Sequence, residues 1–260
     1  MVVIRGPLVL LCGEGGSFQV RAVDLSAVRV KFRGSGGVVS ESELRAASAT
    51  VLAAGRPWRT FRWHRGQAHY SGWYWAATMG QHVVYESRLE LARLLLADFD
   101  PQVTAIAAQP FCVTGGAGGR ERNHVPDFLL IDRMGLVTVV NVKPADRLED
   151  GKVSEALAWA GAVFGQRGWR HEIWTGTSAV VLTNVRFLAG YRNPARLDPG
   201  LVSAVATRVE EPMPLAEIEQ GWPGRGEEAR AAALHLLWRG VVRTDLSVPL
   251  SADTMLEPAA

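Results

Sequence analysis

Two short apolar runs lie close together between residues 124 and 144, in the segment HVPDFLLIDRMGLVTVVNVKP. Val125 to Ile131 and Leu136 to Val142 are short, largely apolar runs rich in branched side chains, which is typical of buried β-strands. Between them, Asp132 to Gly135 supplies the polar and glycine residues of a tight turn. The pattern predicts an antiparallel hairpin whose register brings the start of the first run beside the end of the second.

The N-terminal part of the chain is predicted to contain a small antiparallel leader sheet. Its three short β-like runs are separated by turn residues, and they are Leu8 to Cys12, Phe18 to Val23 and Val28 to Phe32. The segment from Ser40 to Ala54 is predicted to be a helix, because Ser40 and Glu43 have the spacing of a capping box.

The segment HVVYESRLELARLLLADFDP is predicted to begin as a strand and to become a helix near Ser87. This helix is apolar almost all round, so we expect it to be buried. The run from Val103 to Val113 is predicted to be extended and to lead into a glycine-rich loop, TGGAGG.

After the hairpin, Gly151 to Gly165 has apolar residues at helical spacing and is predicted to be a crossover helix. Strands are predicted at Trp169 to Trp174 and at Ala179 to Thr183. Residues 194–199 are predicted to form a linker. Three helical patterns and a β-like wing follow, at Gly200 to Val209, Pro214 to Gln220, Glu227 to Arg239 and residues 241–250.

This order of elements predicts an α/β protein with a mixed sheet flanked by helices. We expect an N-terminal β-rich leader over residues 1–55, a core domain over 56–193 and a C-terminal module over 194–260. Three helices and a wing suggest that the module resembles a winged helix. The alternative is a helical tail that packs on the core.

Composition narrows the class of protein only modestly. The chain has 260 residues, of which 48% are hydrophobic, enough for a packed core. A formal charge of +2 means that any nucleic-acid binding must come from locally clustered charge. Cys12 and Cys112 lie far apart and support neither a disulfide framework nor a zinc site. No apolar run approaches the length of a membrane span or a signal peptide, so we expect a cytoplasmic protein with no membrane partner.

The predicted hairpin carries an acid, Asp127, near the start of one strand and a lysine, Lys143, at the end of the other. A carboxylate, a second oxygen ligand and a main-chain carbonyl such as that of Val142 can hold a hard cation, while an ammonium orients the attacking water. The residues Pro126, Asp127, Asn141, Val142 and Lys143 resemble the P-D…(D/E)-x-K signature of restriction-endonuclease-like nucleases. The alternative is an ordinary hairpin in which Asp127 caps a turn and Lys143 is solvated.

Two further features bear on this site: an amide at the middle position of the signature and a pair of acids upstream of the hairpin. The middle position of the signature is Asn141, whose amide oxygen can ligate a metal but brings no charge. Upstream, Glu86 and Glu90 are four residues apart and would share one face of a continuous helix. A carboxylate on a buried helix needs a partner, which can be a metal or a nearby arginine.

Residues 56–78 interleave arginines with aromatic residues. Arginines in such a pattern can clamp phosphates while the aromatic rings stack on bases or sugars. We expect the four arginines to contact DNA and the aromatic residues to pack on the core; these arginines are Arg56, Arg59, Arg62 and Arg65.

Together these segments resemble the TnsA family, the endonuclease subunits of heteromeric transposases. The resemblance is carried by YESRLE, DFDPQVTAIAAQP, HVPDFLL, VVNVKP, NVRFLAGYR and LLWRGVVRTDLSVPLS, in this order, and covers roughly residues 56–250. It implies a restriction-endonuclease-like domain in which Glu90, Asp127 and Lys143 are catalytic. Glu86 is a second candidate acid, and an amide such as Asn141 is tolerated at the middle position.

The resemblance further implies a Mg²⁺ cofactor, with Mn²⁺ as a substitute, held by Glu90, Asp127, Asn141 and the Val142 carbonyl. It implies cleavage of one strand at transposon ends, with a TnsB-like DDE-type transposase and a TnsC-like AAA+ ATPase as partners. Two alternatives stay open. One is a catalytically inert DNA-binding or scaffolding subunit, which Asn141 favours, and the other is a self-sufficient restriction or repair nuclease.

Overall fold

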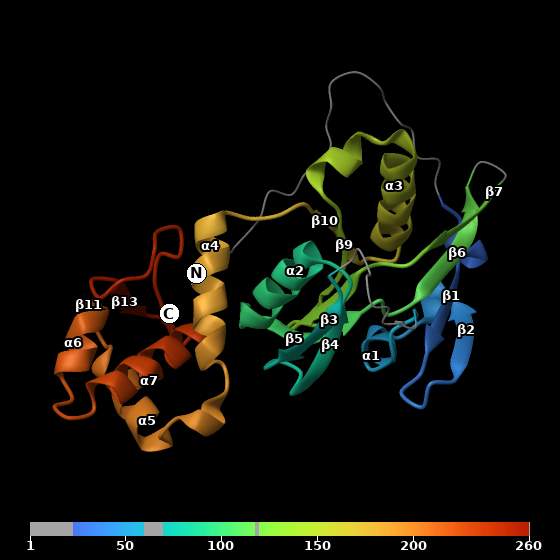
Figure 1. Cartoon of the computed structure of the whole chain (residues 1–260). Helices are drawn as coiled ribbons and strands as arrows, with labels where there is room; N and C mark the ends of the chain where they lie inside the picture. Colours follow the sequence, from blue (N-terminus) through green and yellow to red (C-terminus); the bar gives the residue numbers. More distant parts are fainter. Residues whose placement is uncertain (1–22, 60–69, 118–119, 260) are drawn as a thin grey trace. The chain divides into compact units, whose positions relative to one another are not determined.

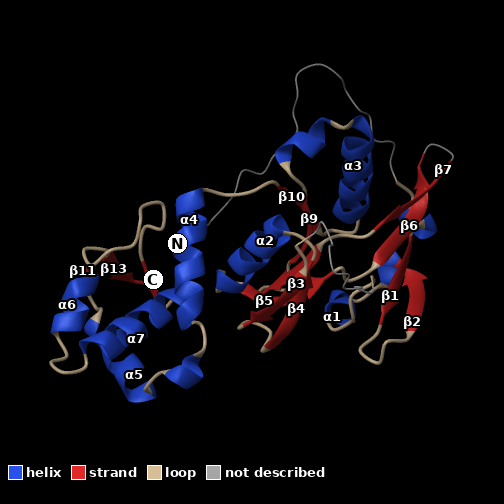
Figure 2. Ribbon diagram, in the orientation of Figure 1, coloured by secondary structure: helices blue, strands red, loops and turns tan. Residues whose placement is uncertain are grey.

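The computed structural model describes residues 23–59, 70–117 and 120–259 (Figure 1). The chain divides into two compact units, described here one at a time. The N-terminal unit comprises the described residues up to 94 together with residues 102–176, and the C-terminal unit comprises residues 95–101 and 177–259. Both units contain helices and strands, so the expected mixed α/β class is confirmed (Figure 2). Residues 23–55 belong to the same unit as the hairpin, and residues 177–193 belong with the C-terminal helices.

The N-terminal unit contains ten strands among its described residues: β1 (Arg29–Arg33), β2 (Val39–Glu43), β3 (Gly72–Ala76), β4 (Gln81–Tyr85), β5 (Val103–Ala108), β6 (Cys112–Ala117), β7 (Arg120–His124), β8 (Phe128–Asp132), β9 (Val137–Val142) and β10 (Arg170–Trp174). Its helices are α1 (Ala49–Ala53), the first part of α2 (Arg88–Phe99), α3 (Gly151–Gln166) and 3-10 turns at Leu25–Ala27, Leu44–Ala46 and Ala145–Glu149. These strands form sheets in the orders β2-β1-β6-β7, β10-β9-β8-β5 and β3-β4.

The predicted hairpin is confirmed as β8 and β9, which pair antiparallel from Phe128 opposite Val140 to Ile131 opposite Val137. Its turn is closed by Asp132, whose Oδ1 accepts hydrogen bonds from the N–H groups of Met134 and Leu136, both at 2.9 Å. The first strand begins three residues later than expected, after Pro126, because proline has no N–H to donate to a ladder. Asp127 therefore stands at the mouth of the hairpin.

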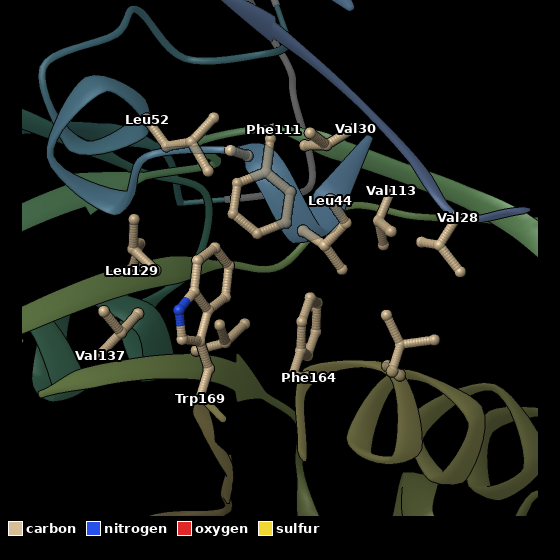
Figure 3. Close-up of a cluster of buried hydrophobic side chains, with 14 of the residues drawn as sticks. Val28, Val30, Leu44, Leu52, Phe111, Val113, Leu129, Val137, Phe164 and Trp169 are labelled. Atoms are coloured by element: carbon tan, nitrogen blue, oxygen red, sulfur yellow. The ribbon is translucent and has the colours of Figure 1, made fainter. Parts of the chain in front are cut away.

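Helix α3 is the crossover expected between two parallel strands, since β10 pairs parallel with β9. The helix packs its buried face on a cluster shared by both four-stranded sheets (Figure 3). In this cluster the ring of Phe164 lies 6.0 Å from that of Phe111 and 6.4 Å from that of Trp169. Apolar burial and aromatic contacts of this kind hold α3 against one face of the sheet.

Helix α2 is fixed to β10 by an ion pair. Arg93 donates from Nε and Nη2 to the two carboxylate oxygens of Glu172, both at 2.8 Å. The Arg93 side chain is only 13% exposed, so this bidentate pair is largely withdrawn from water. The expected change from strand to helix near Ser87 is confirmed, because β4 ends at Tyr85 and α2 begins at Arg88.

The helix expected over Ser40 to Ala54 is wrong for its first part. Residues 39–43 form β2, a 3-10 turn follows, and only Ala49–Ala53 is α-helical. Glu43, the acid of the expected capping box, instead lies 3.8 Å from Arg29 of β1, and the neighbouring Glu41 is 3.4 Å from the same arginine. Cross-strand pairs of opposite charge favour the strand.

Two further expectations need correction, and one concerns the leader runs. Residues 179–183 are not a strand but the start of helix α4 (Ala179–Leu188), so tertiary packing of Val185 and Leu188 overrides their β-branched composition. The first four residues of TGGAGG lie in β6 instead of a loop. Gly115 suits a strand there because an added Cβ would lie 3.1 Å from Val28 Cγ2. Of the leader runs, Val28 to Phe32 corresponds to β1, and the other two lie outside the described residues.

The C-terminal unit is built around helix α7. Its elements are α4, α5 (Pro199–Arg208), β11 (Met213–Pro214), α6 (Leu215–Gln220), α7 (Gly226–Trp238), β12 (Val242–Arg243), β13 (Met255–Pro258) and 3-10 turns at Ala189–Tyr191 and Pro194–Arg196. The three predicted helices after residue 199 are confirmed. The predicted linker contains a 3-10 turn, and the predicted wing contributes only β12, which pairs with β13. Among the described residues, no helix combines the length and apolar character required to cross a bilayer.

The Arg93–Glu172 pair yields a test of how α2 is held. Replacing Arg93 with Met removes two charge-assisted hydrogen bonds and leaves Glu172 without its partner, so we expect the free energy of unfolding to fall by roughly 2 kcal/mol. Urea denaturation measures the change. Arg170→Met, on the exposed face of β10, is the control and should change stability by less than about 0.5 kcal/mol. If the two substitutions lowered stability equally, the Arg93–Glu172 ion pair would have no specific role in holding α2.

Candidate functional site

The hairpin register brings Asp127 and Lys143 together, as the sequence predicted. The Nζ atom of Lys143 lies 3.3 Å from Oδ2 of Asp127 and donates a 2.9 Å hydrogen bond to the carbonyl of Val142. The N–H of Val142 donates to the same Asp127 oxygen at 2.7 Å. Asp127 is thus held through one oxygen by a main-chain amide and an ammonium. Lys143 is half-buried and paired with this carboxylate, whereas the alternative of an ordinary hairpin expected a solvated lysine.

Glu90 is the second acid of this site. Burial raises the pKa of its carboxyl to about 7, and the nearby charges of Asp127 and Glu86 act in the same direction, while a hydrogen bond from the Glu86 N–H opposes the shift. No arginine or lysine within the described residues forms a salt bridge with Glu90. The site therefore contains two close carboxylates and one ammonium, a charge balance that favours a bound cation.

The first turn of α2 fixes the orientation of Glu90. Its Oε2 accepts a hydrogen bond from the Glu86 N–H at 2.8 Å and its Oε1 one from Ser87 Oγ at 3.2 Å, while its own N–H donates to Ser87 Oγ at 3.0 Å. This reciprocal arrangement resembles a capping box. Glu86 lies before the helix, so the expectation that both acids share one helical face is wrong. The Glu86 carboxylate instead lies 3.5 Å from Arg59.

Asn141 is differently placed from the other predicted ligands. It is buried, and its Oδ1 accepts hydrogen bonds from Nε2 of His124 at 3.0 Å and from Nε2 of His171 at 2.9 Å. Burial is the main cause that lowers the pKa of both imidazoles, to about 4 for His171. Both rings are therefore neutral near pH 7. A metal could use the Asn141 oxygen only if one of these hydrogen bonds were given up.

The remaining donors fit a hard divalent cation. Glu90, the second oxygen of Asp127 and the Val142 carbonyl are oxygen ligands of the kind that Mg²⁺ and Mn²⁺ accept. In the described part of the chain, no three His, Cys, Asp or Glu side chains form a metal-binding group by themselves. Any cation here would therefore depend on the main-chain carbonyl and on water for part of its coordination.

Of the four predicted DNA-binding arginines, Arg62 and Arg65 lie outside the described residues. Arg59 is exposed and pairs with Glu86. Arg56 donates from Nε to the Ser35 carbonyl at 2.9 Å, next to the β1–β2 turn. Arg59 is thus the described arginine that reaches the acidic site directly.

Sequence reasoning missed two histidines and one strained residue beside the site. His124 stands three residues before Asp127, a spacing that could have drawn attention to it, whereas His171 carries no sequence signal. Gln109 has a φ of 45°, the only positive value among the described non-glycine residues, and its side-chain Oε1 is buried without a partner. Its N–H donates to the Asp127 carbonyl at 2.9 Å, so backbone strain is located next to the acid.

The raised pKa of Glu90 predicts a specific pH dependence of stability in metal-free protein. Because the folded pKa is near 7 and the unfolded value near 4.5, the folded state binds the proton more tightly, and stability is lost as pH rises from about 4.5 through 7. Glu90→Gln cannot ionise, so its stability relative to the native chain should rise by roughly 2 to 3 kcal/mol between pH 4.5 and pH 8. Urea denaturation with a chelator measures the difference. A pH-independent difference would contradict a raised pKa.

Two comparisons with known proteins give no relative from which a role for this site could be inferred. A scan of the sequence against protein-family models finds no match, and a search among curated proteins finds no relative of significant similarity.

Proposed function

We propose that this chain is a metal-dependent DNA endonuclease of the restriction-endonuclease-like fold and the nicking subunit of a heteromeric transposase. The observation that carries the proposal is the pairing of Asp127 with Lys143 and the Val142 N–H at the mouth of the β8–β9 hairpin, with the buried acid Glu90 beside it. The mixed sheet β10-β9-β8-β5, with helices α2 and α3 packed on it, agrees with such a nuclease core.

The residues of the site have separate roles in the hydrolysis of a phosphodiester. A divalent cation held by Glu90, Asp127 and the Val142 carbonyl would polarise the scissile phosphate and lower the pKa of the attacking water. The Lys143 ammonium then orients this water or stabilises the charge that develops on the phosphate oxygens. Asp127 serves both groups, because one of its oxygens pairs with Lys143 and the other is available to the cation.

Contacts with the substrate and partners belong to other parts of the chain. We assign the DNA backbone to Arg56, Arg59, Arg62 and Arg65; of the two that the structure describes, Arg59 pairs with Glu86. The C-terminal unit, with helices α4 to α7 and the β11-β13-β12 sheet, is a winged-helix-like module in this proposal. Its surface carries both signs of charge, such as the Arg208–Glu217 pair, which suits contacts with a DDE-type transposase or an AAA+ ATPase as well as with DNA.

Two other functions make different predictions. An inert DNA-binding or scaffolding subunit would show no Mg²⁺ or Mn²⁺ uptake that depends on Asp127, and calorimetric titration measures this directly. A self-sufficient restriction or repair nuclease would nick plain DNA without a partner. The absence of a salt bridge to Glu90 among the described residues favours the metal-binding function over the inert one.

The central prediction concerns strand cleavage. We expect Asp127→Asn and Lys143→Ala each to lower the rate of nicking of DNA carrying transposon ends, in Mg²⁺ and with the partner transposase, by at least about a hundredfold. Asp127→Asn should also lose metal uptake, because the second ligand oxygen loses its charge. Gel analysis of nicked product and calorimetry give the two results.

The same region supplies matched controls for these variants. Asp146 and Lys152 are exposed, lie within nine residues of Lys143 in the chain and form no salt bridge with another described residue. Asp146→Asn and Lys152→Ala should therefore nick at the native rate. Retained cleavage by Asp127→Asn, or an equal loss in the controls, would overturn the assignment of the site.

A second prediction concerns the arginines. If all four contact phosphates, changing them together to Ala should weaken DNA binding equally for different sequences and reduce the slope of log K against log salt by about 0.9 per lost contact. Fluorescence anisotropy at several salt concentrations measures the slope. An unchanged slope would assign these arginines to packing, for which the Arg56 contact with Ser35 gives a precedent.

A further inference from the structure

The polar cluster of His124, Asn141 and His171 has no part in the mechanism proposed above. It lies at the end of β9, where the next two residues supply the Val142 carbonyl and Lys143. Asn141 is 1% exposed, so its side chain is removed from bulk water. A polar group buried this deeply requires hydrogen-bond partners, and the two imidazoles provide them.

The chemistry of the amide oxygen fixes the protons of both rings. An amide oxygen carries no hydrogen and accepts through two lone pairs. Because Nε2 of His124 lies 3.0 Å from Asn141 Oδ1 and Nε2 of His171 lies 2.9 Å from it, each Nε2 must carry the hydrogen. The oxygen is then fully used, and Nδ1 of each ring is the unprotonated nitrogen.

The cluster also joins β7 to β9 and β10, two strands with which β7 has no backbone pairing. His124 belongs to β7, Asn141 to β9 and His171 to β10, and β7 is part of the other four-stranded sheet. The Phe164 ring of α3 lies 6.3 Å from the His124 ring and 5.7 Å from the His171 ring. Helix α3 passes His171 at Gly161, where a Cβ would lie 2.9 Å from Nδ1. Packing from α3 therefore fixes both imidazoles.

We propose that Asn141 is a positioning residue and not a metal ligand. Its side-chain oxygen holds His124 and His171 as Nε2–H tautomers, and the three strands joined in this way keep the Val142 carbonyl and Lys143 in place beside Asp127. The inference rests on the proposed function only for the reaction that these positioned groups serve.

The charge of the site explains why an amide suits this position. Glu90 and Asp127 already place two carboxylates near a single ammonium. A third acid at position 141 would add a buried negative charge, whereas an amide offers the same acceptor oxygen to both histidines without one. The departure from the acidic signature is then a consequence of the two histidines and not a loss of function.

The direct test is nitrogen NMR of the full chain labelled at histidine, with signals assigned by single His→Gln substitutions. We expect His124 and His171 to show the Nε2–H tautomer. His235 is an internal reference for the opposite tautomer, because its Nδ1 lies 2.7 Å from the Tyr191 carbonyl and must donate to it. Saturating Mg²⁺ should leave both Nε2–H signals in place. Nδ1–H tautomers at His124 and His171, or loss of the Nε2–H signals when Mg²⁺ binds, would overturn the proposal.

A kinetic test separates positioning from stability. His171→Leu removes one donor and should lower kcat for nicking by about tenfold to a hundredfold, with Mg²⁺ affinity and KM for DNA changed by less than about threefold. His171→Gln keeps an N–H donor and should restore most of the rate. Loss of metal affinity in step with kcat, or no rescue by Gln in a folded variant, would contradict positioning.

The two proposals fail in different ways. A chain without metal uptake or nicking overturns the nuclease assignment, since both the cation and the reaction are then absent. The tautomers of the metal-free protein still decide whether Asn141 holds both histidines. If His171→Leu does not fold, the NMR result decides alone.

Discussion

The antiparallel register of β8 and β9 is the constraint on which the site depends. Pairing Phe128 with Val140 places Asp127 opposite the end of β9, so its carboxylate is within reach of the Val142 N–H and the Lys143 ammonium. A shift of one residue would turn Asn141 and its neighbours to the opposite face. The tight turn closed by Asp132 and the apolar packing of both strands exclude such a shift. Fold and candidate chemistry are therefore specified by the same hydrogen-bond ladder.

Two helices turn this hairpin into a site by packing on the sheet that contains it. Helix α2 brings Glu90 and is held in place three residues later by Arg93, so the rotation of the helix that aims the acid is set by a bond to β10. Helix α3 presses Phe164 against the two histidines that surround Asn141. Helix α2 supplies Glu90, and helix α3 supplies the packing that holds the end of β9 rigid. Neither helix would matter to the site without the sheet between them.

The sequence predicted those parts whose signal is local. The β8–β9 hairpin, the start of α2 near Ser87 and the crossover helix α3 follow from periodicity and turn residues alone. Glu43 misled the prediction of a helix because Arg29, its partner on the neighbouring strand, lies 14 residues away in the chain. His171 could not be foreseen for a similar reason: it is 30 residues from Asn141, and only the parallel pairing of β10 with β9 brings it near.

Val142 has a consequence of a different kind. Its N–H binds the carboxylate and its carbonyl binds the ammonium, so one peptide unit on each side of this residue works in the site while its apolar side chain does not. Any residue other than proline that keeps the strand extended would present the same two atoms. Part of this centre is therefore determined by main-chain conformation and not by the identity of the side chain. Sequence comparison, which scores identical residues, does not detect that part. The same centre in another protein would be recognised by an extended residue whose N–H binds a carboxylate and whose carbonyl binds an ammonium.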